Sequence, residues 1–209
     1  MQKKLSVNPW LGIWIHPRAT IRAIIRYSSG YCLPLLYWIY GFPLLLQIFQ
    51  NTYVGDEASL LTIIISGAIG GLVLGWIGIN ITSSLLYWTG KWVGGKGGYS
   101  GIRAAVSWSS SVSRVTLLIW IIQMIVFKET LFTSGFFQTA FTSSEMIFLG
   151  VSSLLQFVAG VWGCVIMLKT LAEVQQFSTW KALFNLLLMA LVIMGACIVF
   201  SVIVPGLFY

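Results

Sequence analysis

The sequence contains few charged residues and few side chains that could carry out chemistry. Only 8% of its 209 residues are Asp, Glu, Lys or Arg, against about 25% in an ordinary soluble domain. It has one histidine, His16, and three cysteines without paired spacing, at positions 32, 164 and 197. This composition argues against a disulfide framework and a His-based metal cluster, so we expect no metal and no cofactor.

Apolar residues are abundant instead, and they form five long runs. These runs cover residues 31–50, 60–81, 104–127, 146–168 and 182–204. Each is about 20 residues long, the length at which a helix crosses roughly 30 Å of hydrocarbon. The period-two alternation of a membrane barrel is absent. The sequence therefore predicts an all-α polytopic membrane bundle of five transmembrane helices over residues 30–209, preceded by an interfacial amphipathic segment at 1–29.

Lysine and arginine are distributed unevenly between the two sets of connecting segments. Ten of the twelve precede the first, third or fifth run: Lys3, Lys4, Arg18, Arg22, Arg26, Lys91, Lys96, Arg103, Lys169 and Lys181. Only Lys128 lies in the opposite set. Since basic residues stay on the cytoplasmic side, we expect a multi-pass protein of the cytoplasmic (inner) membrane with its N-terminus inside and its C-terminus outside. Anionic headgroups are expected partners, and nucleic acid is not, because no folded basic domain is predicted.

The first 29 residues combine tryptophans with an arginine stripe. Arg18, Arg22 and Arg26 recur at helical spacing after Pro17, and Trp10 and Trp14 precede them. Such a pattern indicates a helix lying on the inner leaflet, or one packed onto the cytoplasmic mouth of the bundle. We interpret these five tryptophans and arginines as a candidate surface for lipid headgroups or for a protein partner.

Small residues form a stripe along the second run. Gly67, Gly71 and Gly75 lie on one helical face, which allows another helix to approach closely. The partner is either another span of the same chain or a second copy, so a homodimer is one interpretation. In the first run, Pro43 predicts a kink or a break near Gly41.

The second run is followed by aromatic residues that we expect to lie outside the straight span. Tyr87, Trp88 and Trp92 surround Lys91, a pattern typical of the aromatic belt at a membrane interface. A glycine-rich turn over residues 94–98 follows.

The third run carries polar residues at helical spacing, including an arginine near mid-bilayer. This stripe consists of Arg103, Ser107, Ser110, Ser111 and Arg114, and Gln156 of the fourth run is expected at a similar depth. An intramembrane arginine is costly unless it faces a partner or a wet cavity. Two interpretations remain: Arg114 snorkels or bonds backbone carbonyls freed at the Pro43 kink, or the stripe lines a polar groove for a headgroup or anionic ligand.

No catalytic residues are predicted. An intramembrane enzyme needs an acid–base or nucleophile pair at depth. None of the five runs contains Asp, Glu or His.

Several spaced Trp, Gly and Arg positions carry a resemblance to a known family. They lie in the segments Asn8–Arg22, Leu86–Gly95, Arg103–Trp108 and Leu171–Leu183. The chain resembles prokaryotic members of the Yip family, the Ypt/Rab-interacting membrane proteins. The resemblance implies a five-span bundle with a cytoplasmic N-terminus. Eukaryotic members are linked to Rab-type GTPases and vesicle traffic, but this chain lacks their acidic Asp-Leu-Tyr-Gly-Pro type motif.

These observations lead to two hypotheses. The first is a non-enzymatic membrane adaptor or organiser with a trafficking-like or membrane-homeostasis role, presenting its distinctive surface around Trp10, Trp14, Arg18 and Arg22. The alternative is a conduit for lipid or a small anionic solute that uses the polar stripe of the third span. A conduit should have a polar cavity that includes Arg114, whereas an adaptor should have a packed core.

Overall fold

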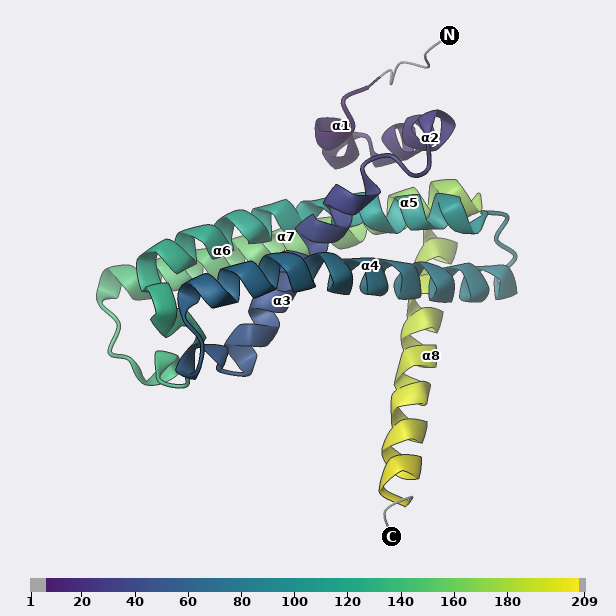
Figure 1. Ribbon diagram of the computed structural model, residues 1–209. Helices are drawn as coiled ribbons and strands as arrows, with labels where there is room; N and C mark the ends of the chain where they lie inside the picture. Colours follow the sequence, from purple (N-terminus) through teal and green to yellow (C-terminus); the bar gives the residue numbers. More distant parts are fainter. Residues whose placement is uncertain (1–6, 207–209) are drawn as a thin grey trace.

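The computed structural model describes residues 7–206, and every regular element among them is helical (Figure 1). The main helices are α1 (Pro9–Ile15), α2 (Pro17–Tyr27), α3 (Leu33–Asn51), α4 (Leu60–Trp92), α5 (Tyr99–Ser109), α6 (Ser113–Phe127), α7 (Ser143–Gln175) and α8 (Thr179–Gly206). Four short 3₁₀ turns connect them: η1 (Val54–Asp56), η2 (Ser110–Val112), η3 (Lys128–Phe132) and η4 (Phe136–Gln138).

Five helical segments are long and apolar enough to cross a membrane, as the sequence predicts. They are α3, α4, the combined segment Tyr99–Phe132, α7 and Thr179–Ser201 of α8. Two differ from the expected spans. Helix α4 continues without interruption to Trp92, so the aromatic stretch expected outside the span belongs to it. The third span is divided, because η2 separates α5 from α6 in the serine-rich stretch.

The helix boundaries follow local sequence signals. Pro9 and Pro17 occupy the first turns of α1 and α2, where proline loses no intrahelical hydrogen bond. Thr142 begins α7 with a capping box, in which its side chain accepts from the Glu145 amide and the Glu145 carboxylate accepts from the Thr142 amide. The single N-terminal helix expected from the sequence is two helices, since the chain turns at His16.

Helices α4, α5–α6 and α7 run side by side, and α3 packs against α4 and α6 (Figure 1). Helix α8 instead leaves this bundle crosswise, and it contacts α4 and α7 near its start (Figure 1). Within the apolar window of α8 only 6% of the residues are buried, against 44% in α3. The α1–α2 pair covers the end of the bundle where α5 begins and α7 ends.

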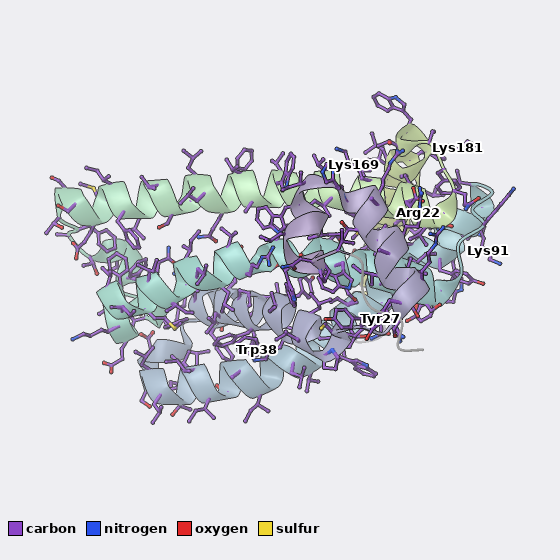
Figure 2. The ribbon with its side chains drawn as sticks, turned by 90° about the horizontal axis from the view of Figure 1, so that it is seen from above. Arg22, Tyr27, Trp38, Lys91, Lys169 and Lys181 are labelled. Atoms are coloured by element: carbon purple, nitrogen blue, oxygen red, sulfur yellow. The ribbon has the colours of Figure 1, made fainter. Side chains whose placement is uncertain are left out.

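The tightest packing lies between α3 and α4. Gly41 of α3 meets Gly71 and Gly75 of α4 so closely that a β-carbon on Gly41 would collide with the α4 backbone. Trp38 adds a hydrogen bond of 3.1 Å from its indole Nε1 to the Ala68 carbonyl. Figure 2 labels Trp38 in this part of the molecule. We call this contact, formed by Gly41, Gly67, Gly71 and Gly75, the glycine seam.

Helix α3 does not break at Pro43, so of the kink or break expected from the sequence the break is wrong. Its helical assignment runs through the proline from Leu33 to Asn51. Phe42, next to the proline, is buried against Gly67 and Gly71. The seam therefore fixes the backbone of α3 on the N-terminal side of the proline and supports a continuous helix there.

Candidate functional site

Arg114 is covered by α1, the first helix of the N-terminal pair. Its Nη2 donates a hydrogen bond to the Trp10 carbonyl at 2.5 Å. Its guanidinium carbon lies 5.5 Å from the ring centre of Trp10 and 5.2 Å from that of Trp14. Two aromatic faces and one carbonyl thus surround a cation for which no carboxylate partner is found among the described residues. Arg114 bonds a backbone carbonyl, as one of the two interpretations expected, but that carbonyl belongs to α1 rather than to the Pro43 region.

Aromatic stacking fixes α1 against α5. The rings of Trp10 and Trp108 meet edge to face, with their centres 5.0 Å apart. The Tyr31 ring stacks on the same Trp108 ring, with the two centres 6.2 Å apart. Trp108 is fully buried. Such contacts add to the area that the rings bury, so α1 is part of the packed core and its tryptophans are only partly accessible.

The first two arginines of the α2 stripe contact the bundle. Arg22 forms an ion pair of 2.7 Å with Glu173 near the end of α7. Arg18 donates a hydrogen bond of 2.7 Å to the Thr179 hydroxyl at the start of α8. Arg26, in contrast, is exposed and has no hydrogen-bond or ion-pair partner among the described residues. The predicted surface is therefore divided into two docking arginines and one free arginine.

The predicted polar stripe of the third span does not form one groove. Ser107 and Ser111 are fully buried, and neither hydroxyl has a hydrogen-bond partner within the described residues. The Arg103 guanidinium lies 5.7 Å from the ring centre of Tyr99. Ser110 and Gln156 line a common cavity, and the lining of this cavity includes neither Arg103 nor Arg114. The break at η2 explains the division, because residues before and after it no longer share one straight helical face.

Gln156 lies between two cavities. The first, of about 330 Å³, is lined by Ser110, Ser113 and Thr116 together with Gln156. The second, of about 400 Å³, is lined by further glutamines, at positions 47, 50 and 123, and again by Gln156. Apolar residues line both cavities too, and the polar groups among their lining residues are uncharged, which suits water or a neutral hydrogen-bonding solute better than an anion.

The glycine stripe on α4 is occupied within the chain. Gly67, Gly71 and Gly75 are buried, and their neighbours belong to α3. A second copy could not use this face without displacing α3.

A buried polar network where α4 and α7 end and α8 begins was not anticipated from the sequence. Thr89 donates a hydrogen bond of 2.6 Å to the Asn185 side chain, and both Asn185 and Gln175 donate at 3.3 Å to the Leu86 carbonyl. Gln175 also accepts from the Gly97 amide at 3.3 Å. The available signal was an Asn and a Gln close to the ends of apolar runs, where a buried amide can join helices.

No three His, Cys, Asp or Glu side chains come together as a metal site would require, within the part of the chain that the structure describes.

The fold and these contacts define a class of protein, a polytopic all-helical membrane protein whose N-terminal helices are docked on the bundle. The family model of the Yip1 domain matches residues 11–201. The chain therefore belongs to the Yip1 domain family, as the resemblance in its sequence indicated. Neither the curated proteins nor the solved structures gave a match.

Proposed function

We propose that this protein is a non-enzymatic membrane adaptor or organiser with a trafficking-like or membrane-homeostasis role. One observation carries the proposal: α1 and α2 are fixed to the bundle through Arg114, Arg22 and Arg18, and they form an ordered surface at its basic end. A docked pair of helices whose first member, α1, covers Arg114 fits an adaptor better than a conduit through Arg114. Figure 2 shows Arg22, Lys91, Lys169 and Lys181 toward this same end.

The basic end is proposed to face the cytoplasm. Arg22 precedes the first expected span, Lys91 precedes the third, and Lys169 and Lys181 precede the fifth. By the positive-inside rule, this distribution supports an N-terminus inside and a C-terminus outside. In this orientation the surface formed by α1 and α2 faces the anionic inner leaflet. Lipid headgroups are therefore proposed as partners in addition to a protein.

A non-enzymatic role is supported by the positions of the carboxylates. Glu145 caps the start of α7, and Glu173, near the other end, is paired with Arg22. Neither forms an acid–base pair with a second titratable group in the middle of a span, which intramembrane catalysis would need.

The test is a crosslinking pull-down from native membranes, read by mass spectrometry. The variant Arg18→Ala/Arg22→Ala removes both docking contacts of α2, so partners that recognise the docked surface should be lost. The matched control is Lys169→Ala/Lys181→Ala, which removes the same charge from exposed positions at the same end. If the wild-type protein crosslinks only to itself and to bulk lipid, or if both variants lose the same partners, the adaptor proposal is wrong.

The two cavities that share Gln156 support a second candidate, a conduit for a small polar solute or for a lipid headgroup. Here the transport path would avoid Arg114. In reconstituted liposomes, Gln156→Leu should then reduce solute flux or lipid exchange, whereas Arg114→Leu should not. Equal rates in wild-type and Gln156→Leu liposomes would eliminate this candidate.

A further inference from the structure

A second basic feature lies at the inner end of the bundle, where three segments meet around a cleft. The cleft has a volume of about 620 Å³ and is bounded by α2, by the loop between α4 and α5, and by the end of α7. Its charged lining residues are Arg22, Arg26, Lys96 and Glu173. We call it the basic cleft. Lys96 belongs to the glycine-rich turn over residues 94–98, and its place in the sequence does not associate it with the arginine stripe of α2.

The charges of this cleft are not balanced within the chain. Among the described residues the one ion pair found joins Arg22 to Glu173, at 2.7 Å. Arg26 and Lys96 therefore line the cleft without a carboxylate partner. With three cations and one carboxylate, the lining carries a net charge of +2. An uncompensated pair of cations in a concave site attracts anions more strongly than the same pair on a flat surface.

The backbone adds to this positive character. Helix α5 begins at Tyr99, and its cap residue Gly98 offers no side-chain acceptor to the free amides of the first turn. Gly98 and Ser100 both line the cleft. Free amides at a helix start carry partial positive charge and favour an anion. Here they coincide with the two unpaired cations.

The loop that carries Lys96 is held in place rather than loose. The Lys96 amide donates to the Gln175 carbonyl at 3.2 Å, and the Gly97 amide donates to the Gln175 side chain at 3.3 Å. Gln175 itself is buried. The cleft is thus pre-organised, which lowers the entropic cost of binding a ligand.

We propose that the basic cleft binds an anionic phosphate group, supplied by the headgroup of a negatively charged phospholipid or by a free phosphate ester. Arginine and lysine with helix-start amides are the donors that phosphate oxygens accept best. The volume exceeds that of one phosphate ion and leaves room for the group esterified to it. The inference rests on the proposed function only for the side of the membrane that the cleft faces.

The experiment measures binding to the full-length protein in neutral detergent, with three probes. These are inorganic phosphate, short-chain phosphatidic acid and short-chain phosphatidylcholine. Binding of phosphatidic acid well above inorganic phosphate assigns the site to a lipid, whereas equal binding of both assigns it to free phosphate. Either result supports the phosphate site. Failure of all three probes to bind, or preference for phosphatidylcholine, overturns it.

Two sets of variants test whether the binding belongs to this cleft. Arg26→Gln/Lys96→Gln should weaken phosphate binding about tenfold or more, since it removes two charge-assisted contacts. Lys169→Gln/Lys181→Gln removes the same charge at exposed positions outside the cleft and should leave binding within about twofold, as expected for screened surface charges. Equal losses in the two variants would show non-specific attraction and would overturn the proposal.

A single position gives an independent test that does not threaten the fold. Gly98 has an extended conformation, and a β-carbon added there meets no other atom within 4 Å. Asp and Asn both cap helices well, so Gly98→Asp and Gly98→Asn should each fold. Only Gly98→Asp places a carboxylate in the cleft, and it should abolish phosphate binding. Retained binding in Gly98→Asp would overturn the proposal. Because this readout involves no protein partner, its failure is distinguishable from failure of the adaptor proposal in the pull-down.

Discussion

Helices α3 and α8 are attached to the same neighbour, α4, in opposite ways. Helix α3 meets α4 along the glycine seam, where backbone lies against backbone. The first turns of α8 contact α4, and there the Thr89 side chain of α4 donates a hydrogen bond to the Asn185 side chain of α8. One attachment depends on the absence of side chains and the other depends on a buried polar pair.

This difference shows how a membrane bundle is held together without a hydrophobic force between its helices. Lipid tails are as apolar as leucine, so association depends on close packing and on interhelical hydrogen bonds. Close packing extends along the whole seam, which makes α3 part of the bundle. The polar network acts at one end of α8, and the remaining turns of that helix are free to contact lipid.

The largest effect is expected from filling the glycine seam. A β-carbon on Gly71 would lie 2.6 Å from the Cα of Phe42, and backbone atoms cannot move aside as a flexible side chain can. Gly71→Leu should therefore lower stability by at least about 3 kcal/mol or prevent folding. Thermal unfolding in detergent measures this change. Gly160→Leu is the control, since a β-carbon there meets nothing within 4 Å. Equal melting temperatures for the two variants would contradict the seam.

A smaller effect is expected at the polar attachment of α8. Asn185→Leu leaves the Thr89 hydroxyl without its interhelical acceptor and should cost about 1–2 kcal/mol. The change should loosen the start of α8, so amide hydrogen exchange should rise at residues 179–186 but not in α3. The neighbouring change Phe184→Leu, at an exposed position, is the control. If exchange in α8 stays as in the wild type, the network does not hold the helix.

Features that lie within one helix could be predicted from the sequence, whereas contacts between helices could not. Spans are encoded in local hydropathy, so five helices and the glycine face of α4 could be recognised from residues close together in the chain. The interhelical network could not, because Leu86, Gln175 and Asn185 meet only after three helices have packed. The interruption at η2 was missed because serines were interpreted as a stripe on one straight helix.

Arg114 illustrates the limit for a candidate site. Its depth predicts that it needs a partner, but residues 104 positions away supply that partner from α1. No periodicity within the third span indicates this contact. The arginine stripe of α2 is similar, since helical spacing predicts its common face but not that Arg18 and Arg22 dock while Arg26 remains free.

An effect similar in size is expected where Arg114 contacts α1. Arg114→Leu removes the hydrogen bond to Trp10 and both cation–π contacts, which are worth about 1–2 kcal/mol together. Exchange of the amides of α1 should then rise about fivefold or more, while α7 is unchanged. Arg114→Lys keeps the charge but lacks the planar guanidinium, so it should restore only part of the protection. Full protection in Arg114→Leu would mean that aromatic stacking alone holds α1.

The smallest effect is expected at the ion pair between Arg22 and Glu173. Their side chains are 55% and 21% exposed, so solvent screens their attraction. Glu173→Gln should therefore change stability by less than about 1 kcal/mol. The matched control is Glu57→Gln, in the loop between α3 and α4.

Glu173→Gln also removes the one carboxylate that lines the basic cleft, and it releases Arg22 to face a ligand. Glu173→Gln should then tighten phosphate binding severalfold although it hardly affects folding. If it weakens binding instead, the carboxylate holds Arg22 in the position that the ligand requires, and the ion pair matters for recognition rather than for stability.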